Sequence, residues 1–231
     1  KNAIKKVHSK IVFLNDLLKI DSGISESNSK KLLVLQNGVD SDLFVDEKQN
    51  QNNEVDIIFT GNIRRFNEDR GIKFIIDCFL NPKIPENYKL KIISWPLDEV
   101  EKLRIYVESI KLTNRVQILN KLDRKSTITN IENSKIGLLT NSSKDSHSVN
   151  HTSPLKYFEY LYGELNIVAV DFPSHRSLPY SDNIVFFKEN DQEGFIKAVT
   201  EALDKKIIPR QQLSDITLDK RVNKLLNFIK D

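Results

Sequence analysis

The sequence predicts an α/β domain built on an open, mainly parallel β-sheet with helices on both faces. Short runs rich in β-branched residues alternate with longer segments that have helical spacing. These runs are apolar almost throughout, as expected of strands that are covered on both faces. The alternation of strand and helix is typical of a Rossmann-like domain.

Eight runs have the composition of buried strands, and the segments between them carry helical spacing or helix-end signals. The expected strands are residues 10–14, 31–36, 55–60, 89–94, 115–119, 135–140, 166–170 and 183–187. The expected helices are residues 71–80, 97–111, 124–134, 153–163 and 191–206, with a closing helix at the C-terminal end. The polar segment 46–54 is typical of a flexible connection.

Length and composition favour one large globular domain. The chain has 231 residues, of which 39% are hydrophobic and 29% charged. A net charge of +3, from 35 Lys and Arg against 32 Asp and Glu, is too balanced to indicate a nucleic-acid-binding surface. We therefore expect no nucleic-acid partner.

The cysteine content, the apolar runs and the start of the chain indicate where in the cell the protein is expected. Cys78 is the single cysteine, so no disulfide can form within the chain and a reducing compartment is favoured. No apolar run is long enough to cross a bilayer, and no signal peptide opens the chain. We expect a cytoplasmic protein. The chain starts at Lys1 and has no methionine, which indicates a processed start or an excised piece of a longer protein.

In open parallel sheets, ligands bind where the strands end and the following helices begin. The corresponding loops are residues 61–71, 94–97, 120–124 and 140–154. Candidate functional residues are therefore sought there.

The segment SPLKYFEYLYG, residues 153–163, predicts a helix with a sharp start. Ser153 suits the N-cap and Pro154 the first helical position. The free backbone N–H groups of Leu155 and Lys156, with the helix dipole behind them, favour an anion such as phosphate. Glu159 lies one turn further, where a carboxylate can accept hydrogen bonds from two ribose hydroxyls. The alternative is a surface Glu159 paired with Lys156 or Lys188.

The loop after the strand at 55–60 is basic. It carries Arg64, Arg65 and Arg70, and Gly71 opens the next helix. Arginine forks bind two phosphate oxygens at once, which suits a diphosphate; a solvated basic loop is the alternative. The loop has neither a dinucleotide nor a P-loop glycine pattern. The histidines and Cys78 show no metal-ligand spacing, so no metal is expected.

Three segments together resemble the donor-binding half of family-4 retaining glycosyltransferases, which have the GT-B fold. LQNGVDSDLF is similar to the family's NGVD segment, and FTGNIRRFNEDRG to its diphosphate loop. SPLKYFEYLYGELNIVAVDFPSHR is similar to its SPLKLFEYMAxGKPVVASDxPS signature. The terminal LDKRVNKLLNFI also resembles the family's last helix, so the resemblance covers nearly the whole chain from about Glu26.

This resemblance implies roles for individual residues. Glu159 would hold the nucleotide ribose, and the segment from Ser153 through Pro154 to Leu155 would supply backbone N–H groups to the donor phosphates, although Pro154 itself has none. Arg70 takes the place of the family lysine that stabilises the leaving diphosphate, so Arg70 and Glu159 are the expected catalytic residues. Gly61 belongs to the diphosphate loop. The loop Asn120 to Leu122 takes the position that frames the base.

Two positions depart from the family pattern. Asn62 replaces the arginine that follows Gly61, so Arg64 or Arg65 would substitute for it. His151 stands where many members have a Glu that faces the donor sugar. A sugar-facing His151 and a plain loop histidine are both open. Trp95 lies near a ligand edge, where it could stack on a base or sugar or anchor its loop.

The resemblance implies a hexosyl-type transferase that uses a nucleotide-diphosphate sugar without a metal or other cofactor. The acceptor, a glycan or lipid-linked molecule of surface polysaccharide synthesis, would be bound by a missing N-terminal domain. On this view residues 1–25 are the end of that domain or a linker, residues 26–214 the nucleotide-sugar-binding domain, and residues 215–231 the closing helix. The isolated chain would then be inactive.

Two other functions stay open from the sequence. A non-catalytic module that binds a sugar nucleotide would fit the departures at Asn62 and His151. A GT-B sugar-nucleotide epimerase would share the architecture. Peripheral association of the complete enzyme with the inner face of the membrane is also left open.

Overall fold

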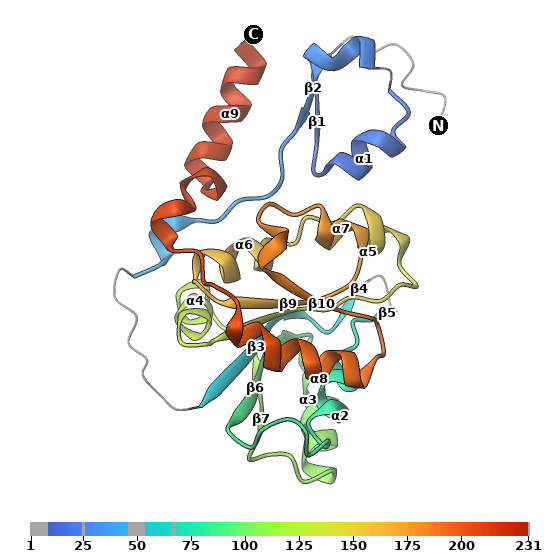
Figure 1. Ribbon diagram of the computed structural model, residues 1–231, viewed down its shortest axis with the longest axis vertical. Helices are drawn as coiled ribbons and strands as arrows, with labels where there is room; N and C mark the ends of the chain where they lie inside the picture. The colour runs from blue at the N-terminus through green and yellow to red at the C-terminus, as the bar shows by residue number, and fades with distance from the viewer. Residues whose placement is uncertain (1–8, 25, 46–53, 66–67, 231) are drawn as a thin grey trace.

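The computed structural model describes residues 9–24, 26–45, 54–65 and 68–230, while the side chains of residues 26–28 and 65 lie outside that description. Its centre is a six-stranded, fully parallel sheet with the strand order β10-β9-β8-β3-β6-β7 (Figure 1). The strands are β3 (Val55–Asn62), β6 (Tyr88–Trp95), β7 (Val116–Asn120), β8 (Ile136–Leu139), β9 (Asn166–Val170) and β10 (Ile184–Phe187). The predicted Rossmann-like α/β fold is confirmed.

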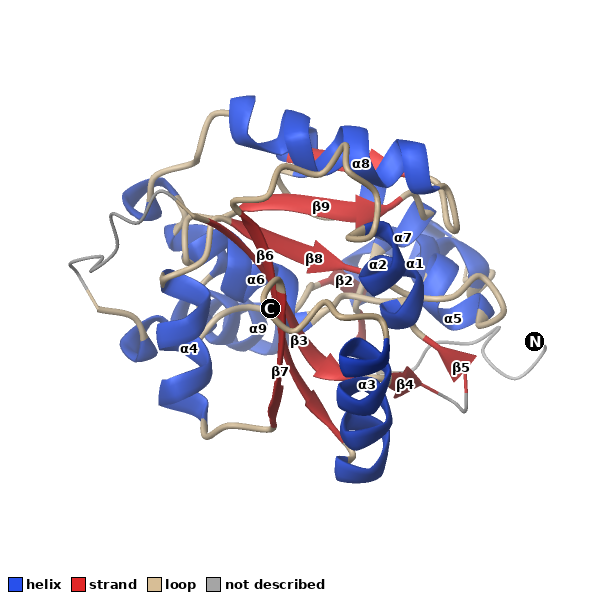
Figure 2. Ribbon diagram, turned by 90° about the horizontal axis from the view of Figure 1, so that it is seen from below, coloured by secondary structure: helices blue, strands red, loops and turns tan. Residues whose placement is uncertain are grey.

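Helices cover both faces of the sheet, as predicted. One face carries α2 (Ile72–Cys78), α3 (Leu97–Ser109) and α8 (Gln192–Glu201), and the other carries α4 (Arg124–Glu132) and α6 (Leu155–Tyr162) (Figure 2). The helices α1, α5, α7 and α9 complete the described set, at Asp16–Asp21, Ser146–Asn150, Pro173–Arg176 and Leu218–Lys230. The short α1, α5 and α7 were not predicted, because four to six residues give too little periodicity.

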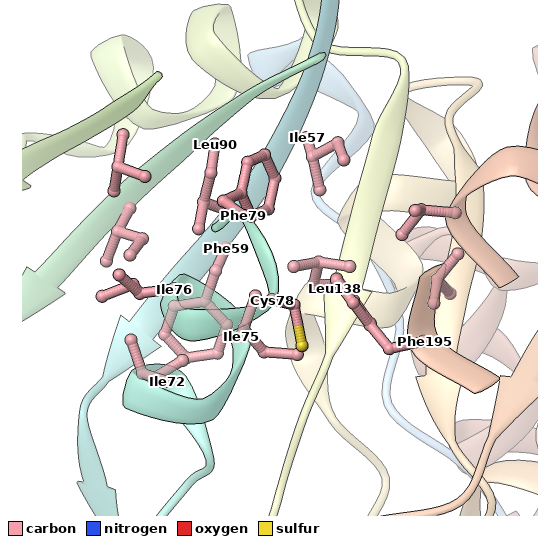
Figure 3. Packing of buried hydrophobic residues seen from close by; sticks show 14 of the residues in the cluster. Ile57, Phe59, Ile72, Ile75, Ile76, Cys78, Phe79, Leu90, Leu138 and Phe195 are labelled. Atoms are coloured by element: carbon pink, nitrogen blue, oxygen red, sulfur yellow. The ribbon is translucent and has the colours of Figure 1, made fainter. Parts of the chain in front are cut away.

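Two apolar cores result from the alternation of side chains along each strand. From β3, Ile57 and Phe59 point into the core beneath α2 and α8, whereas Ile58 points toward α4 and α6. Figure 3 shows the first core, where Phe195 of α8 and Cys78 of α2 meet the sheet. Cys78 lies in an apolar segment, which predicts a buried, inert thiol, and the structure buries it. Burial raises the pKa of the Cys78 thiol to about 12.

The predicted strands at 10–14 and 31–36 form but do not join the main sheet. They are β1 (Ile11–Phe13) and β2 (Leu32–Val34), which pair with each other in parallel. An apolar run predicts a strand but not its neighbour, so the sequence could not separate this pair from the other six. A second small pair, β4 (Arg64–Arg65) and β5 (Glu68–Asp69), lies in the basic loop.

The part of the chain that carries β1, α1 and β2, residues 11–24 and 26–34, is called the β1–β2 segment below. It contacts the main domain through buried polar groups. Asn15 is 1% exposed, and its side-chain amide donates to the carbonyl oxygens of Asn150 and Thr152, 3.2 and 3.4 Å away. Lys10, which directly precedes β1, contacts the opposite end of the chain. Its ammonium group donates to the carbonyl oxygens of Phe228 and Ile229 in α9. Figure 1 accordingly shows α9 beside the β1–β2 segment. None of the helices within the described ranges has the length and apolar character needed to cross a membrane.

Candidate functional site

The site lies at the topological switch point of the sheet. From β3 the chain adds β6 and then β7 on one side, and β8, β9 and β10 follow on the other. In such sheets the crevice at the carboxyl ends of the strands is the place where ligands bind. A cavity of about 620 Å³ opens here, which is a size typical of small-molecule sites.

Elements far apart in the sequence line this cavity. The walls come from the ends of β3 and β6 and from the starts of α4 and α6, together with the loop before α6. Eight of the predicted site residues are among the lining residues: Gly61, Arg70, Leu122, His151, Ser153, Pro154, Leu155 and Glu159. The cavity also contains side chains that the sequence did not single out.

Two cations meet above the ring of Phe59 in β3. Arg70 and Lys156 are only 8% and 9% exposed, and Lys156 Nζ lies 3.7 Å from the centroid of the Phe59 ring. A Cβ atom on Gly61 would lie 3.3 Å from Lys156 Nζ and 3.6 Å from Arg70 Nη1. Gly61 has φ of +130°, a conformation that favours glycine, so the backbone here closely approaches both cations. An anion is the complementary ligand for this end of the cavity.

The guanidinium of Arg70 is held across the switch point. Its Nε donates to Asn141 Oδ1 at 2.9 Å, just after β8, and its Nη1 donates to the carbonyl oxygen of Asn62 at 3.3 Å, at the end of β3. These contacts join the ends of β3 and β8 at the switch point of the strand order. A fixed guanidinium of this kind loses little freedom when it binds a diphosphate.

The start of α6 differs from the prediction in one respect. Ser153 is not the N-cap, because its hydroxyl accepts a hydrogen bond from the backbone N–H of Asn37 at 3.0 Å, and Pro154 takes the cap position in extended conformation. The helix therefore begins at Leu155. Its spacing from Phe158 and Tyr162 predicts a place on the core face of the helix, but Leu155 is 56% exposed. The Asn37 contact places the NGVD turn beside the helix start, and the N–H groups of a helix start can bind an anion.

Glu159 is buried, which excludes the alternative of a surface residue. Its side chain is 6% exposed and its Oε1 lies 2.6 Å from Nη2 of Arg124, the first residue of α4. The ion pair that the structure gives Glu159 is thus with a residue that the prediction did not name. Glu159 faces the cavity one turn into α6, as predicted.

Another part of the cavity wall carries aromatic and apolar side chains. Trp95, at the end of β6, is 37% exposed, and Lys121 Nζ lies 5.5 Å from the centroid of its ring. Leu122 also lines the cavity. The side chain of Asn120 points away, because its Oδ1 accepts from Arg104 Nη2 at 2.9 Å, and Asn120 is not among the lining residues.

His151 lies at the mouth of the cavity. Its Nε2 is 2.6 Å from Oδ2 of Asp21, the last residue of α1, and its ring centroid is 5.9 Å from that of His147. The side chain is 22% exposed. His151 therefore connects the β1–β2 segment to the loop that lines the cavity.

The other basic-loop residues take different positions. Asn62 accepts a hydrogen bond from the backbone N–H of Arg64, and Arg64 lies 3.7 Å from Glu99 of α3. Neither is among the lining residues. Arg65 belongs to β4, and its side chain lies outside the described part of the chain.

Sequence reasoning missed Lys156 and Arg124 as cavity side chains. Lys156 had a signal: the other residues from 157 to 161, apart from Glu159, are large aromatic or apolar side chains. A helix with such a sequence is covered on most sides, and its lysine is buried too. Arg124 had none, because only the packing of α4 beside α6 brings it to Glu159.

The positive charges of the site also act on His175 in α7. This histidine is fully buried, and its Nδ1 is 2.8 Å from the carbonyl oxygen of Val170. Burial, and secondarily the charges of Lys156 and Arg70, lower the pKa of His175 from 6.5 to about 4. His175 is therefore neutral in the native protein at neutral pH.

This low pKa predicts a loss of stability in acid. Between pH 6.5 and 4 the unfolded chain binds a proton at residue 175 that the folded chain does not, so the free energy of unfolding falls as pH falls. The loss between pH 7 and 4.5 should be about 2 kcal/mol smaller in His175→Asn, as measured by urea unfolding at both pH values. Equal losses in the two proteins would show that His175 does not titrate in this way.

Comparison with known proteins agrees with the fold. No protein-family model matches the chain, and no curated protein matches it by sequence. Among solved structures, a glycosyltransferase from Rickettsia africae ESF-5 is similar over 96% of this chain and 63% of its own, with a TM-score of 0.69 and 15% identity.

Two further structures have similar values. The lipopolysaccharide outer core galactosyltransferase WaaB matches 96% of this chain and 61% of its own, with a TM-score of 0.68 and 14% identity. Sucrose-phosphate synthase from Thermosynechococcus elongatus matches 95% of this chain and 57% of its own, with a TM-score of 0.67 and 12% identity. The chain thus spans 57–63% of the length of these structures.

The chain has the fold of a Rossmann-like domain of GT-B glycosyltransferases. At 12–15% identity this likeness establishes the fold and not the activity. The activity has to be argued from the cavity.

Proposed function

We propose that the chain is the donor-binding domain of a retaining, family-4-like glycosyltransferase, and that its cavity binds a nucleotide-diphosphate sugar. One observation carries the proposal: two buried cations, Arg70 and Lys156, flank a helix start, and the buried carboxylate of Glu159 lies one turn further in the same cavity. A cationic end followed by a carboxylate is complementary to a phosphate followed by a ribose.

The spacing along α6 supports this orientation. Leu155 and Glu159 are four residues apart, which is about 6 Å along a helix axis and of the order of the separation between the phosphates and the ribose hydroxyls of a nucleotide. The diphosphate then lies against Arg70, Lys156 and the N–H groups of α6. The base extends toward Leu122 and Trp95, where apolar and aromatic surface is available.

The proposed reaction uses these groups to stabilise the leaving diphosphate. The acceptor hydroxyl attacks the anomeric carbon on the face of the leaving group, forming a C–O bond as the bond to the diphosphate breaks. The diphosphate leaves with the electron pair, and one of its oxygens takes the proton of the acceptor hydroxyl. Arg70, Lys156 and the α6 dipole stabilise the charge that develops on the diphosphate. The proposed reaction needs no metal ion.

The remaining parts of the proposal concern the whole enzyme. The three neighbours are longer than this chain, and we propose that a further domain binds the acceptor, a glycan or lipid-linked molecule of surface polysaccharide synthesis. On this proposal residues 1–25 lead from that domain, residues 26–214 bind the donor, and residues 215–231 close the fold. A hexosyl donor, a cytoplasmic location and an isolated chain without turnover belong to the same proposal.

Trp95 provides a direct test, because it is the single tryptophan of the chain and lines the cavity. Titration with UDP, GDP or ADP should change its fluorescence, and at least one of the three should bind with a Kd of about 10 µM to 1 mM. Inorganic phosphate should bind much more weakly. The proposal is contradicted if none of the three changes the fluorescence and calorimetry detects no binding.

A non-catalytic sugar-nucleotide-binding module is the second candidate, and His151 favours it. Where many family members have a carboxylate facing the donor sugar, His151 pairs with Asp21. The two candidates differ in the full-length protein: transfer of sugar from a donor panel supports the enzyme, and tight binding of the same donors without transfer supports the module.

A further inference from the structure

The pair formed by Arg124 and Glu159 extends the proposed function to a residue of another element. Arg124 Nη2 lies 2.6 Å from Glu159 Oε1, and both residues line the cavity. The Glu159 side chain is 6% exposed and the Arg124 side chain 51%. The contact therefore joins a buried acceptor to a donor that reaches it from the cavity edge.

The position of Arg124 is electrostatically unfavourable without this contact. It is the first residue of α4, where the positive end of the helix dipole disfavours a cation. The carboxylate of Asp123 offsets part of this, because it caps the helix by accepting from the Ser126 N–H at 2.8 Å and from the Ser126 hydroxyl at 2.6 Å. Glu159 supplies a second negative charge, which lies against the Arg124 guanidinium itself.

The pair leaves room for a ligand at the carboxylate. An ionised carboxylate has about four lone-pair positions, and the ion pair with Arg124 involves only Oε1. Two vicinal hydroxyls can use the others. The cation beside Oε1 also favours the carboxylate orientation that faces it before the ligand arrives.

We propose that Arg124 is a positioning residue: its ion pair holds the Glu159 carboxylate in the orientation that accepts both ribose hydroxyls, and it thereby sets the preference for ribonucleotides over 2′,3′-dideoxynucleotides. This inference rests on the proposed function. Arg124 acts through Glu159 and needs no contact with the nucleotide.

The test compares one nucleoside diphosphate with its 2′,3′-dideoxy form, using Trp95 fluorescence. Arg124→Gln should weaken the ribonucleotide about tenfold and leave the dideoxy form within about twofold. Arg124→Lys, which keeps the charge without the planar fork, should lose less and serves as a second variant if Arg124→Gln folds poorly. Lys125→Gln, which removes the same charge from the next residue of α4, should leave both affinities unchanged.

A double substitution separates positioning from direct contact. Arg124→Gln added to Glu159→Gln should cause no further loss of ribonucleotide affinity. Equal losses for both ligand forms in Arg124→Gln, or wild-type or tighter ribonucleotide binding, would overturn the role of Arg124 while the proposed function stands. If the wild-type chain binds no nucleoside diphosphate, the proposed function fails, and this inference with it.

Discussion

Glu159→Ala should lower the affinity for a nucleoside diphosphate about 10²-fold and leave the 2′,3′-dideoxy form almost unchanged. The reason is the loss of two charge-assisted hydrogen bonds to the ribose, worth about 3 kcal/mol together. The substitution leaves Arg124 without its partner, but that side chain is 51% exposed and can be hydrated. Trp95 fluorescence with both ligand forms gives the two affinities.

Glu201→Ala is the matched control for this prediction. It removes a carboxylate from α8, outside the cavity, where Glu201 pairs with Lys197. It should bind both ligand forms as the wild type does. If Glu159→Ala keeps the wild-type affinity while its thermal unfolding shows an intact fold, Glu159 does not hold the ribose.

Lys156→Met should also lower the affinity for a nucleoside diphosphate about 10²-fold, but should change that for the unphosphorylated nucleoside by no more than about twofold. A buried lysine next to the phosphates makes a charge-assisted contact that a methionine of similar length cannot make. Arg70→Ala should show the same selectivity. Calorimetry with the nucleoside and its mono- and diphosphate measures the dependence on phosphate number.

Lys188→Met removes a lysine charge outside the cavity and should bind all three ligands as the wild type does. A loss of nucleoside affinity in Lys156→Met equal to the loss for the diphosphate would place Lys156 at the base or ribose instead. That result would reverse the proposed orientation of the nucleotide.

The strands of this fold could be predicted because their signal is local. The run NIVAV is apolar at every position after Asn166, and β9 is buried at every position. The pairing of β1 with β2 could not be predicted, because the order of strands depends on contacts between distant segments. The same holds for α9, whose end meets Lys10 from the other end of the chain.

The candidate site likewise has features that the sequence could predict and features that it could not. The approach of Gly61 and Arg70 to the start of α6 follows from the rule that the carboxyl ends of parallel strands share one edge. The N-cap at Ser153 was wrong, because the hydroxyl bonds to Asn37 from a segment more than a hundred residues away. Arg124 was missed for a similar reason: its partner Glu159 belongs to another helix.

The most direct measurement is a crystal structure of the chain with the nucleoside diphosphate that binds best. We predict phosphate oxygens within hydrogen-bonding distance of Arg70, Lys156 and the N–H groups at the start of α6, with both ribose hydroxyls on Glu159. A nucleotide bound outside this cavity, or one with its base against Arg70 and Lys156, would contradict the assignment of this chain as a donor-binding domain of the proposed kind.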